Sequence, residues 1–379
     1  MGNNYAFCNC KNEEVESEGN FKECNSQLEN TNISNPHTNR HEIPFKTKCK
    51  QRIDIEKIKK TNAVNKIIKI YRAYKNKTRT FKYSSTNKDI GNYSSTENSS
   101  KLKQMRSQST KKILTYIGDK KNGIKEGFGI QIWLGGAKYI GYYHNDKAEG
   151  FGQFIAANDK YEGQFVLDVA CGYGEYYHSN GAIYKGDWKE DAQNNIGIET
   201  WKDGSCYKGE YAHGKKNGIG IYVWPDGSRY EGEWVDNSLN GYGVYYFTQN
   251  RMYLGEWKDN IKEGFGEFIW SDKKYMGFYV NDKKEGFGIY YWETMNKIFV
   301  GFWEGGKQRG LGKYMKKSKQ IKYGIWDEDE HIKWIHHEEA NSMMDNETIK
   351  PFKHFFLLSY DEVCKYLENN DIYSITFRE

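Results

Sequence analysis

A strict alternation of aromatic or glycine residues with polar residues dominates the chain from about residue 116 onward. In Tyr230-Glu-Gly-Glu-Trp234 the tyrosine, the glycine and the tryptophan occupy every second position. Because successive side chains of a β-strand point to opposite faces of a sheet, these three residues are predicted to share one face. Gly264, Gly266, Phe268 and Trp270 alternate in the same way and predict a further strand.

The alternating segments recur with a nearly constant period. The leading aromatic residues are spaced 22 to 24 residues apart, and each is followed two positions later by glycine. A second pair of glycines lies 11 and 13 positions after the leading aromatic, except where Asn195 replaces the first of them. Repetition at this period indicates a repeat protein, built here from β-hairpins with a glycine floor and an aromatic cover. The leading aromatics are Tyr116, Tyr139, Tyr161, Tyr184, Tyr207, Tyr230, Tyr253, Tyr275 and Phe299.

The Tyr-x-Gly-x-aromatic and Gly-x-Gly elements resemble the MORN repeat family (membrane occupation and recognition nexus). The resemblance covers roughly residues 116 to 335, and Lys322-Tyr-Gly-Ile-Trp326 is similar to a degenerate last unit. It implies an all-β repeat fold, an elongated, twisted, single-layer antiparallel sheet of consecutive β-hairpins. It also implies a role in scaffolding or membrane apposition without catalysis.

The composition agrees with a repeat sheet. Hydrophobic residues make up only 37% of the 379 residues, which is low for a compact two-layer core, whereas a repeat buries its aromatics against its neighbours. No run of 18 apolar residues occurs, and no secretory segment follows Met1. These patterns predict a cytoplasmic protein without a membrane span.

The net charge of +5 conceals a strong asymmetry. Residues 1–112 carry 23 basic and 11 acidic side chains, a charge of +12, which leaves −7 for the remainder. Within the first part, residues 46–82 alone carry 14 basic and 2 acidic side chains. This distribution favours an anionic membrane or an acidic partner for the first part, and it argues against phosphoinositide binding by the acidic repeats.

The extreme N-terminus matches a lipidation signal in part. Gly2 is a candidate for myristoylation, although Ala6 stands where the motif prefers Ser or Thr, and Cys8 and Cys10 are candidates for palmitoylation. One myristoyl chain binds membranes only marginally, so the acylated cysteines or the basic stretch would supply the second signal. The alternative is an ordinary disordered start with two free thiols.

A basic amphipathic helix is predicted between residues 53 and 82. Its apolar residues recur at helical spacing and lysine and arginine cover most of the rest, which is typical of calmodulin targets and of membrane-surface helices. Ile70-Tyr-Arg-Ala-Tyr-Lys75 also resembles a degenerate IQ motif, the calmodulin-binding signature. A calmodulin-like partner, an anionic membrane and packing on the chain's own sheet all remain open. The residues assigned to this site are Val64, Ile67, Ile68, Lys69, Ile70, Tyr71, Arg72 and Lys75.

Five segments make up the predicted organisation: 1–52, disordered with a candidate lipid anchor; 53–82, the basic helix; 83–112, a linker; 113–335, the repeats; and 336–379, a helical capping tail for the last hairpin. Ser359-Tyr-Asp-Glu362 predicts a capping box for a short helix in this tail. The sequence contains no catalytic motif and no metal-ligand spacing, so we expect no enzyme activity, cofactor or metal.

The expected function is a non-enzymatic scaffold whose sheet binds protein partners and which is tethered to a membrane or to a cytoskeletal structure at the cell cortex or cilium. Nucleic acid is not expected among the partners. The alternatives are a regulatory subunit of a phosphoinositide kinase or another signalling enzyme, and a phosphoinositide-binding module.

Overall fold

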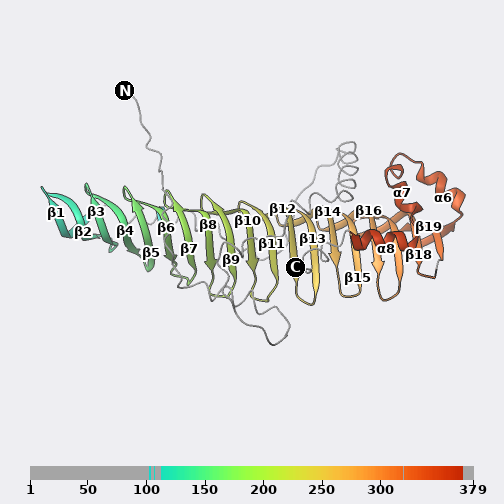
Figure 1. Ribbon diagram of the computed structural model, residues 1–379, viewed down its shortest axis with the longest axis horizontal. Helices are drawn as coiled ribbons and strands as arrows, with labels where there is room; N and C mark the ends of the chain where they lie inside the picture. Colours follow the sequence, from blue (N-terminus) through green and yellow to red (C-terminus); the bar gives the residue numbers. More distant parts are fainter. Residues whose placement is uncertain (1–101, 104–105, 107–111, 319, 370–379) are drawn as a thin grey trace, which may run out of the picture. The chain divides into compact units, whose positions relative to one another are not determined.

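The computed structural model describes residues 102–103, 106, 112–318 and 320–369. Its strands belong to one open sheet of 20 strands, in which each strand pairs antiparallel with its neighbours in sequence (Figure 1). The predicted all-β repeat fold of consecutive hairpins is therefore confirmed.

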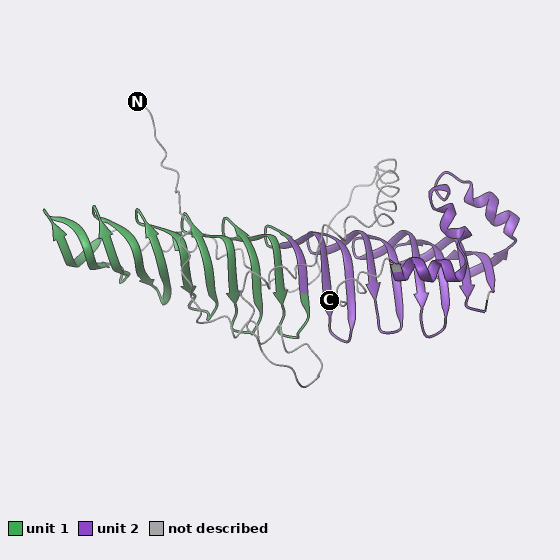
Figure 2. Cartoon of the chain, in the orientation of Figure 1, with its two compact units in different colours: residues 1–36, 93–229, 234–237 green, residues 37–92, 230–233, 238–379 purple. Residues whose placement is uncertain are grey.

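The chain divides into two units, which are described separately (Figure 2). Unit 1 includes residues 112–229 and 234–237, and unit 2 includes residues 230–233 and 238–369. Strand β11 (Arg229–Val235) contributes to both. The strands of unit 1 are β1 (Ile113–Lys121), β2 (Ile124–Trp133), β3 (Lys138–His144), β4 (Lys147–Ala156), β5 (Asp159–Val166), β6 (Val169–Tyr177), β7 (Ile183–Lys189), β8 (Ala192–Thr200), β9 (Cys206–Ala212) and β10 (Lys215–Val223). The strands of unit 2 are β12 (Ser238–Phe247), β13 (Arg251–Lys258), β14 (Ile261–Ile269), β15 (Lys273–Val280), β16 (Lys283–Trp292), β17 (Lys297–Glu304), β18 (Lys307–Lys316), β19 (Ile321–Asp327) and β20 (Glu330–Ile335).

The leading tyrosines form one face of the sheet, which we call the aromatic face. The ring of Tyr253 lies over Gly255 and over Gly266, which faces Gly255 on the next strand. Its hydroxyl donates a hydrogen bond to the carbonyl oxygen of Glu256 at 3.1 Å, so the buried polar atom is satisfied. The ring also contacts Trp257 edge-to-face, with centroids 5.1 Å apart. The predicted sharing of one face by tyrosine, glycine and tryptophan is confirmed.

The hairpin turns tie each repeat to the one before it. Between β15 and β16, Asn281 and Asp282 both have positive φ, 50° and 64°, as a two-residue type I′ turn requires. The Asp282 carboxylate accepts a hydrogen bond from the backbone N–H of Lys262 at 2.9 Å. Asp329 accepts one from the N–H of Gln308 in the same way, at 2.7 Å. The Asn and Asp residues of the turns thus both permit the turn and connect neighbouring hairpins.

The C-terminal tail consists of short helices: α6 (His337–Met344), the 3-10 helix η2 (Lys350–Phe352), α7 (Lys353–Leu357) and α8 (Tyr360–Asn369). The predicted capping box is present, because Glu362 accepts from the N–H and the hydroxyl of Ser359 and Ser359 accepts from the N–H of Glu362. The tail covers more of the sheet than the last hairpin. Its Phe352, Phe355 and Phe356 share one hydrophobic cluster with residues of β14 to β19.

Candidate protein-binding surface

The face opposite the aromatic face carries one side chain between the paired glycines of each repeat, as in Gly127-Phe128-Gly129. We call these positions the inter-glycine row. In an antiparallel pair, directly facing residues have side chains on the same face. Phe128 faces Tyr142 on the next strand, and their rings contact edge-to-face with centroids 5.6 Å apart. The row is Phe128, Phe151, Tyr173, Ile196, Ile219, Tyr242, Phe265, Phe287 and Leu311.

In unit 2 the row residues of β14, β16 and β18 are covered by the chain's own helices. Phe265 faces Phe278, and Phe287 faces Phe302, so apolar side chains meet across each strand pair. Phe352 of the tail stacks on Phe287, with centroids 4.5 Å apart and an interplanar angle of 11°. The row residues of β14, β16 and β18 are consequently buried. The apolar pairs of these strands are therefore covered by helices of the same chain.

In unit 1 the row is open to solvent. Phe128, Phe151, Tyr173 and Ile196 are 47%, 54%, 39% and 44% exposed, and Tyr142 is 55% exposed. The same register position is thus covered in one unit and uncovered in the other. A series of exposed large apolar side chains that recurs on every second strand, here β2, β4, β6 and β8, marks an interaction site more often than scattered ones do.

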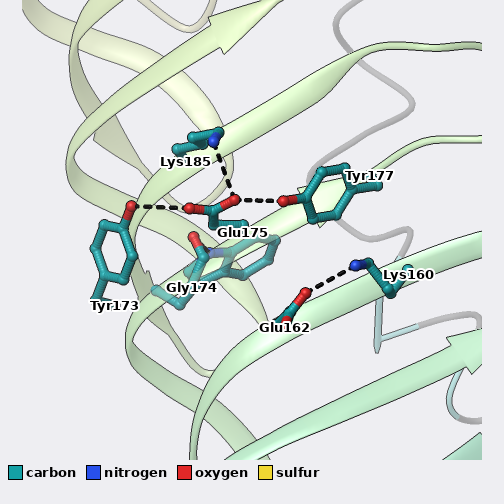
Figure 3. A network of polar contacts seen from close by, with 8 residues as sticks. Lys160, Glu162, Tyr173, Gly174, Glu175, Tyr177 and Lys185 are labelled. Atoms are coloured by element: carbon teal, nitrogen blue, oxygen red, sulfur yellow. Dashed lines mark hydrogen bonds and ion pairs between the residues drawn. The ribbon is translucent and has the colours of Figure 1, made fainter. Parts of the chain in front are cut away.

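A network of polar contacts centred on Glu175 lies among these apolar side chains on β6 and β7 (Figure 3). The hydroxyl groups of Tyr173 and Tyr177 donate to the two carboxylate oxygens of Glu175, at 3.3 Å and 2.5 Å. The ammonium of Lys185 lies 3.1 Å from the second oxygen. Tyr173 is therefore held in place by its hydroxyl while its ring remains half exposed, which gives a partner a preformed contact.

A second ion pair continues this network on β5. The Lys160 ammonium lies 2.7 Å from the Glu162 carboxylate, and Glu162 faces Glu175 across the strand pair. The hydrogen bond from Lys160 lowers the pKa of Glu162, so this carboxylate is ionised at neutral pH. Gln153 also donates to it at 2.9 Å. The two neighbouring carboxylates are each compensated by a lysine, which fixes their geometry.

The residues that face the row in unit 1 become acidic along the chain. Tyr173 faces Asp187, and Ile196 faces Glu210. At the corresponding positions of unit 2, Phe278 and Phe302 are apolar. The open surface therefore offers apolar contacts bordered by carboxylates, whereas the row residues of β14 and β16 face apolar side chains.

The sequence-predicted site residues are not among those described. Gly2, Cys8, Cys10 and the helix residues of 53–82 all lie outside residues 102–103, 106, 112–318 and 320–369. Sequence reasoning did not single out the inter-glycine row as a site. The available signal was the change in the facing residues, from acidic at Asp187 and Glu210 to apolar at Phe278 and Phe302.

The described part of the chain holds no group of three or more His, Cys, Asp or Glu side chains arranged to bind a metal ion. None of its helices has both the length and the apolar character needed to cross a membrane.

A family model for the MORN repeat matches nine segments, 116–137, 139–159, 161–183, 184–206, 207–229, 230–250, 253–274, 275–294 and 299–319. The chain is also similar to alsin of Mus musculus and of Homo sapiens, with 28% identity over 93 residues. That match covers 23% of this chain and 6% of alsin, so the chain corresponds to a small part of these relatives.

Among solved structures, the TCP10 domain of Danio rerio CPAP matches with a TM-score of 0.27 and 8% identity, covering 51% of this chain and 96% of that domain. The TCP domain of Drosophila melanogaster SAS-4, solved in complex with a proline-rich motif of Ana2, matches with a TM-score of 0.23 and 12% identity. It covers 51% of this chain and 86% of that one.

Proposed function

Because the chain belongs to the MORN repeat family, we propose that it is a non-enzymatic scaffold whose inter-glycine row in unit 1 binds a protein partner. The family is built of all-β repeats and is generally non-enzymatic. The proposal is supported by one observation above all. Phe128 and Tyr142 form an exposed aromatic pair in the register in which unit 2 pairs Phe265 with Phe278 beneath the chain's own helices.

The chemistry of the surface favours an amphipathic helix as the bound element. In unit 2 the covering residues are helical aromatics, and Phe352 lies flat on Phe287. The open row offers similar rings to a partner, but it is bordered by Asp187 and Glu210. A helix with an apolar stripe flanked by lysine or arginine matches this arrangement in both shape and charge.

The proposed scaffold is tethered through its first 82 residues to a membrane or to a cytoskeletal structure at the cell cortex or cilium. The support is the sequence alone: the candidate acylation sites and the basic stretch lie together, and the repeats are acidic. In this proposal residues 1–82 attach the chain, and unit 1 binds the protein partner.

The test is proximity labelling in cells with the tagged full chain. Phe151→Ser and Tyr142→Ser together should reduce labelling of a specific set of proteins by on the order of tenfold, because buried aromatic contacts dominate interface energies. The control is Leu134→Ser, which removes a side chain that is also strongly exposed but lies outside the row. If Phe151→Ser and Tyr142→Ser together leave the labelled set unchanged while the melting temperature is also unchanged, this surface binds no partner.

A further inference from the structure

Four of the nine repeats carry lysine at one position of the aromatic face, nine residues after the leading aromatic. The lysines are Lys125, Lys216, Lys262 and Lys284, and the other five repeats carry Ala148, Ala170, Gln193, Leu239 and Gln308. Across the hairpin, Lys216 faces Tyr211 and Lys262 faces Trp257, the second aromatics of their repeats. Each ammonium lies over the leading tyrosine of its own repeat, an arrangement stabilised by attraction between the cation and the ring. The ammonium-to-centroid distances are 5.2 Å for Lys216 and Tyr207, 5.8 Å for Lys262 and Tyr253, and 5.1 Å for Lys284 and Tyr275.

Two consecutive repeats of unit 1 carry alanine at this position. Ala148 faces Tyr143, and Ala170 faces Phe165. Both alanines are buried, and alanine brings no cation to the tyrosines of these repeats. The side-chain volume that lysine fills elsewhere is therefore available to another group.

Arg106, from the segment that precedes the first strand, supplies that cation. Its guanidinium lies 2.5 Å from the carboxylate of Asp191 and 5.8 Å from the ring centroid of Phe165. Arg106 and Ala148 line the same cavity of about 250 Å³, together with Tyr139. The positive charge of Arg106 also opposes the effect of burial on the tyrosine pKa values of these two repeats, which burial raises.

A second side chain of the same segment is anchored as well. Leu102 and Arg106 both have helical backbone conformation, and residues four apart lie on the same side of a helix. Leu102 is almost completely buried, whereas the neighbouring Lys103 is exposed. Leu102 is thus shielded from solvent and Arg106 is held by Asp191, whereas Lys103 is open to solvent.

We propose that Ala148, Ala170 and Asp191 form a binding site for an arginine-bearing helix, and that Arg106 of the same chain, together with the buried Leu102, occupies it as a releasable intramolecular ligand. The site lies on the aromatic face, so the proposal is independent of the inter-glycine row. Arg106 makes a charge-assisted hydrogen bond in a partly buried setting, which is stronger than a neutral one. A partner helix with leucine and arginine at the same spacing competes for the site and releases the segment.

Hydrogen exchange of the full chain tests whether the segment is bound. Asp191→Asn removes the charge but keeps the acceptor for the N–H of Ala170, because Asn237 and Asn260 accept the equivalent N–H groups in other repeats. We expect exchange over residues 102–106 to become about tenfold faster in Asp191→Asn and in Arg106→Gln, as loss of a charge-assisted contact predicts. The control is Asp329→Asn, which changes the same turn position in unit 2. In this variant hydrogen exchange over residues 102–106 should stay at the parent rate. Unchanged exchange in both Asp191→Asn and Arg106→Gln would overturn the proposal.

A peptide experiment tests whether the site accepts a ligand in trans. A fluorescent peptide of residues 96–111 is titrated into the full chain carrying Arg106→Glu, in which the internal segment lacks its cation. The parent peptide should bind about tenfold more tightly than the same peptide with Arg106→Glu, because only the parent peptide pairs with Asp191. Ala170→Lys in the full chain introduces the lysine that other repeats carry at this position. This substitution should abolish the difference in affinity between the two peptides. Equal binding of the two peptides, or binding of neither, shows that the contact is not a ligand site.

Discussion

The glycines of the leading-aromatic motif are required because a ring and a facing strand lie directly against them. A Cβ atom at Gly255 would lie 2.6 Å from the Cα of Gly266 and 2.6 Å from the Tyr253 hydroxyl. Both contacts are far inside van der Waals distance, and the first is to backbone, which has little room to move. The dense aromatic face therefore depends on the absence of a side chain at this position.

We expect Gly255→Ala to lower the free energy of unfolding by about 3 kcal/mol or more, because overpacking against backbone has no inexpensive relaxation. The matched control is Gly286→Ala. Gly286 has a φ of +69°, but a Cβ atom there would meet nothing within 4 Å, so only backbone strain of about 1–2 kcal/mol opposes that change. Urea unfolding of the two variants measures the difference, and equal destabilisation would contradict the steric explanation.

Lys313 gives the tail an unusual dependence on pH. The side chain is buried and its ammonium donates to the carbonyl oxygen of Leu358. Burial lowers its pKa to about 8, and the charge of Glu362 opposes this only in part. Between about pH 8 and 10 the unfolded state therefore holds more protons than the folded state, so stability rises with pH by roughly 1–2 kcal/mol after allowance for remaining hydration.

The rise in stability should give way to a fall as the pH approaches the ordinary tyrosine pKa of about 10. Burial raises the pKa of Tyr253 and Tyr279, so these hydroxyl groups ionise in the unfolded state before they ionise in the folded one, and stability then falls. Unfolding by urea across pH 7 to 11 checks the shape of the curve. Lys313→Met should reduce the rise and keep the fall, because burial also lowers the pKa of Lys216 and Lys284, which contribute in the same direction. A rise of the parent size in Lys313→Met would assign it to those lysines alone.

At the scale of elements, the tail helices stabilise the sheet by covering an apolar face that hairpins alone leave open. Phe356 is fully buried and contacts Phe302, with ring centroids 6.1 Å apart, while the adjacent Leu357 is exposed. We expect Phe356→Ala to cost about 3–5 kcal/mol and Leu357→Ala less than about 0.5 kcal/mol. The measurement is thermal unfolding with a dye that binds exposed apolar surface. Similar effects of the two substitutions would show that the tail does not cover the sheet in solution.

The hairpins were predictable because their determinants are local. Tyr253, Gly255 and Trp257 lie within five residues, and the two-residue period alone places them on one face. Which positions of the inter-glycine row are covered and which are open could not be predicted from such local patterns. The helical cover of the row depends on the contact between Phe352 and Phe287. These two residues are 65 positions apart in the chain, and no sequence period relates them.

The contact between Arg106 and Asp191 was even less predictable from local sequence patterns. The two residues are 85 positions apart, and the alanines that make room for the arginine read as ordinary strand residues. Only the comparison of one register position across the repeats, with lysine at 216, 262 and 284 and alanine at 148 and 170, reveals the gap. Small departures from a repeat are therefore more informative about sites than the repeat itself.

At the scale of the whole molecule, charge separates the first part of the chain from the repeats. The basic stretch at 46–82 carries a charge of +12, and the chain beyond residue 112 carries −7. This stretch includes Lys69, Arg72 and Lys75 of the predicted helix, which lie outside the described residues. Each lysine or arginine near an anionic membrane contributes about 1 kcal/mol of attraction. An acidic calcium sensor of the calmodulin type, bound to Ile67, Ile68 and Tyr71, would shield the same charges from the membrane.

We predict that membrane attachment requires a lipid chain and the basic helix together. A single myristoyl chain at Gly2 gives reversible binding on the order of 10⁴ M⁻¹, which is too weak to retain the chain. Cell fractionation should therefore show Gly2→Ala in the soluble fraction. The combined change of Lys66, Lys69, Arg72 and Lys75 to Glu should have the same effect, because it replaces attraction to anionic lipid with repulsion.

A third variant separates the two candidate sources of the second signal. Cys8→Ser with Cys10→Ser removes the palmitoylation candidates and leaves the basic charge, so this variant should stay attached if the helix supplies that signal. Loss of attachment in the cysteine variant but not in the glutamate variant would instead assign the signal to acylation. Retention of Gly2→Ala on membranes at the parent level would remove the lipid anchor altogether. The repeats would then have to reach their partner without attachment at Gly2, and their net charge of −7 beyond residue 112 does not favour an anionic leaflet.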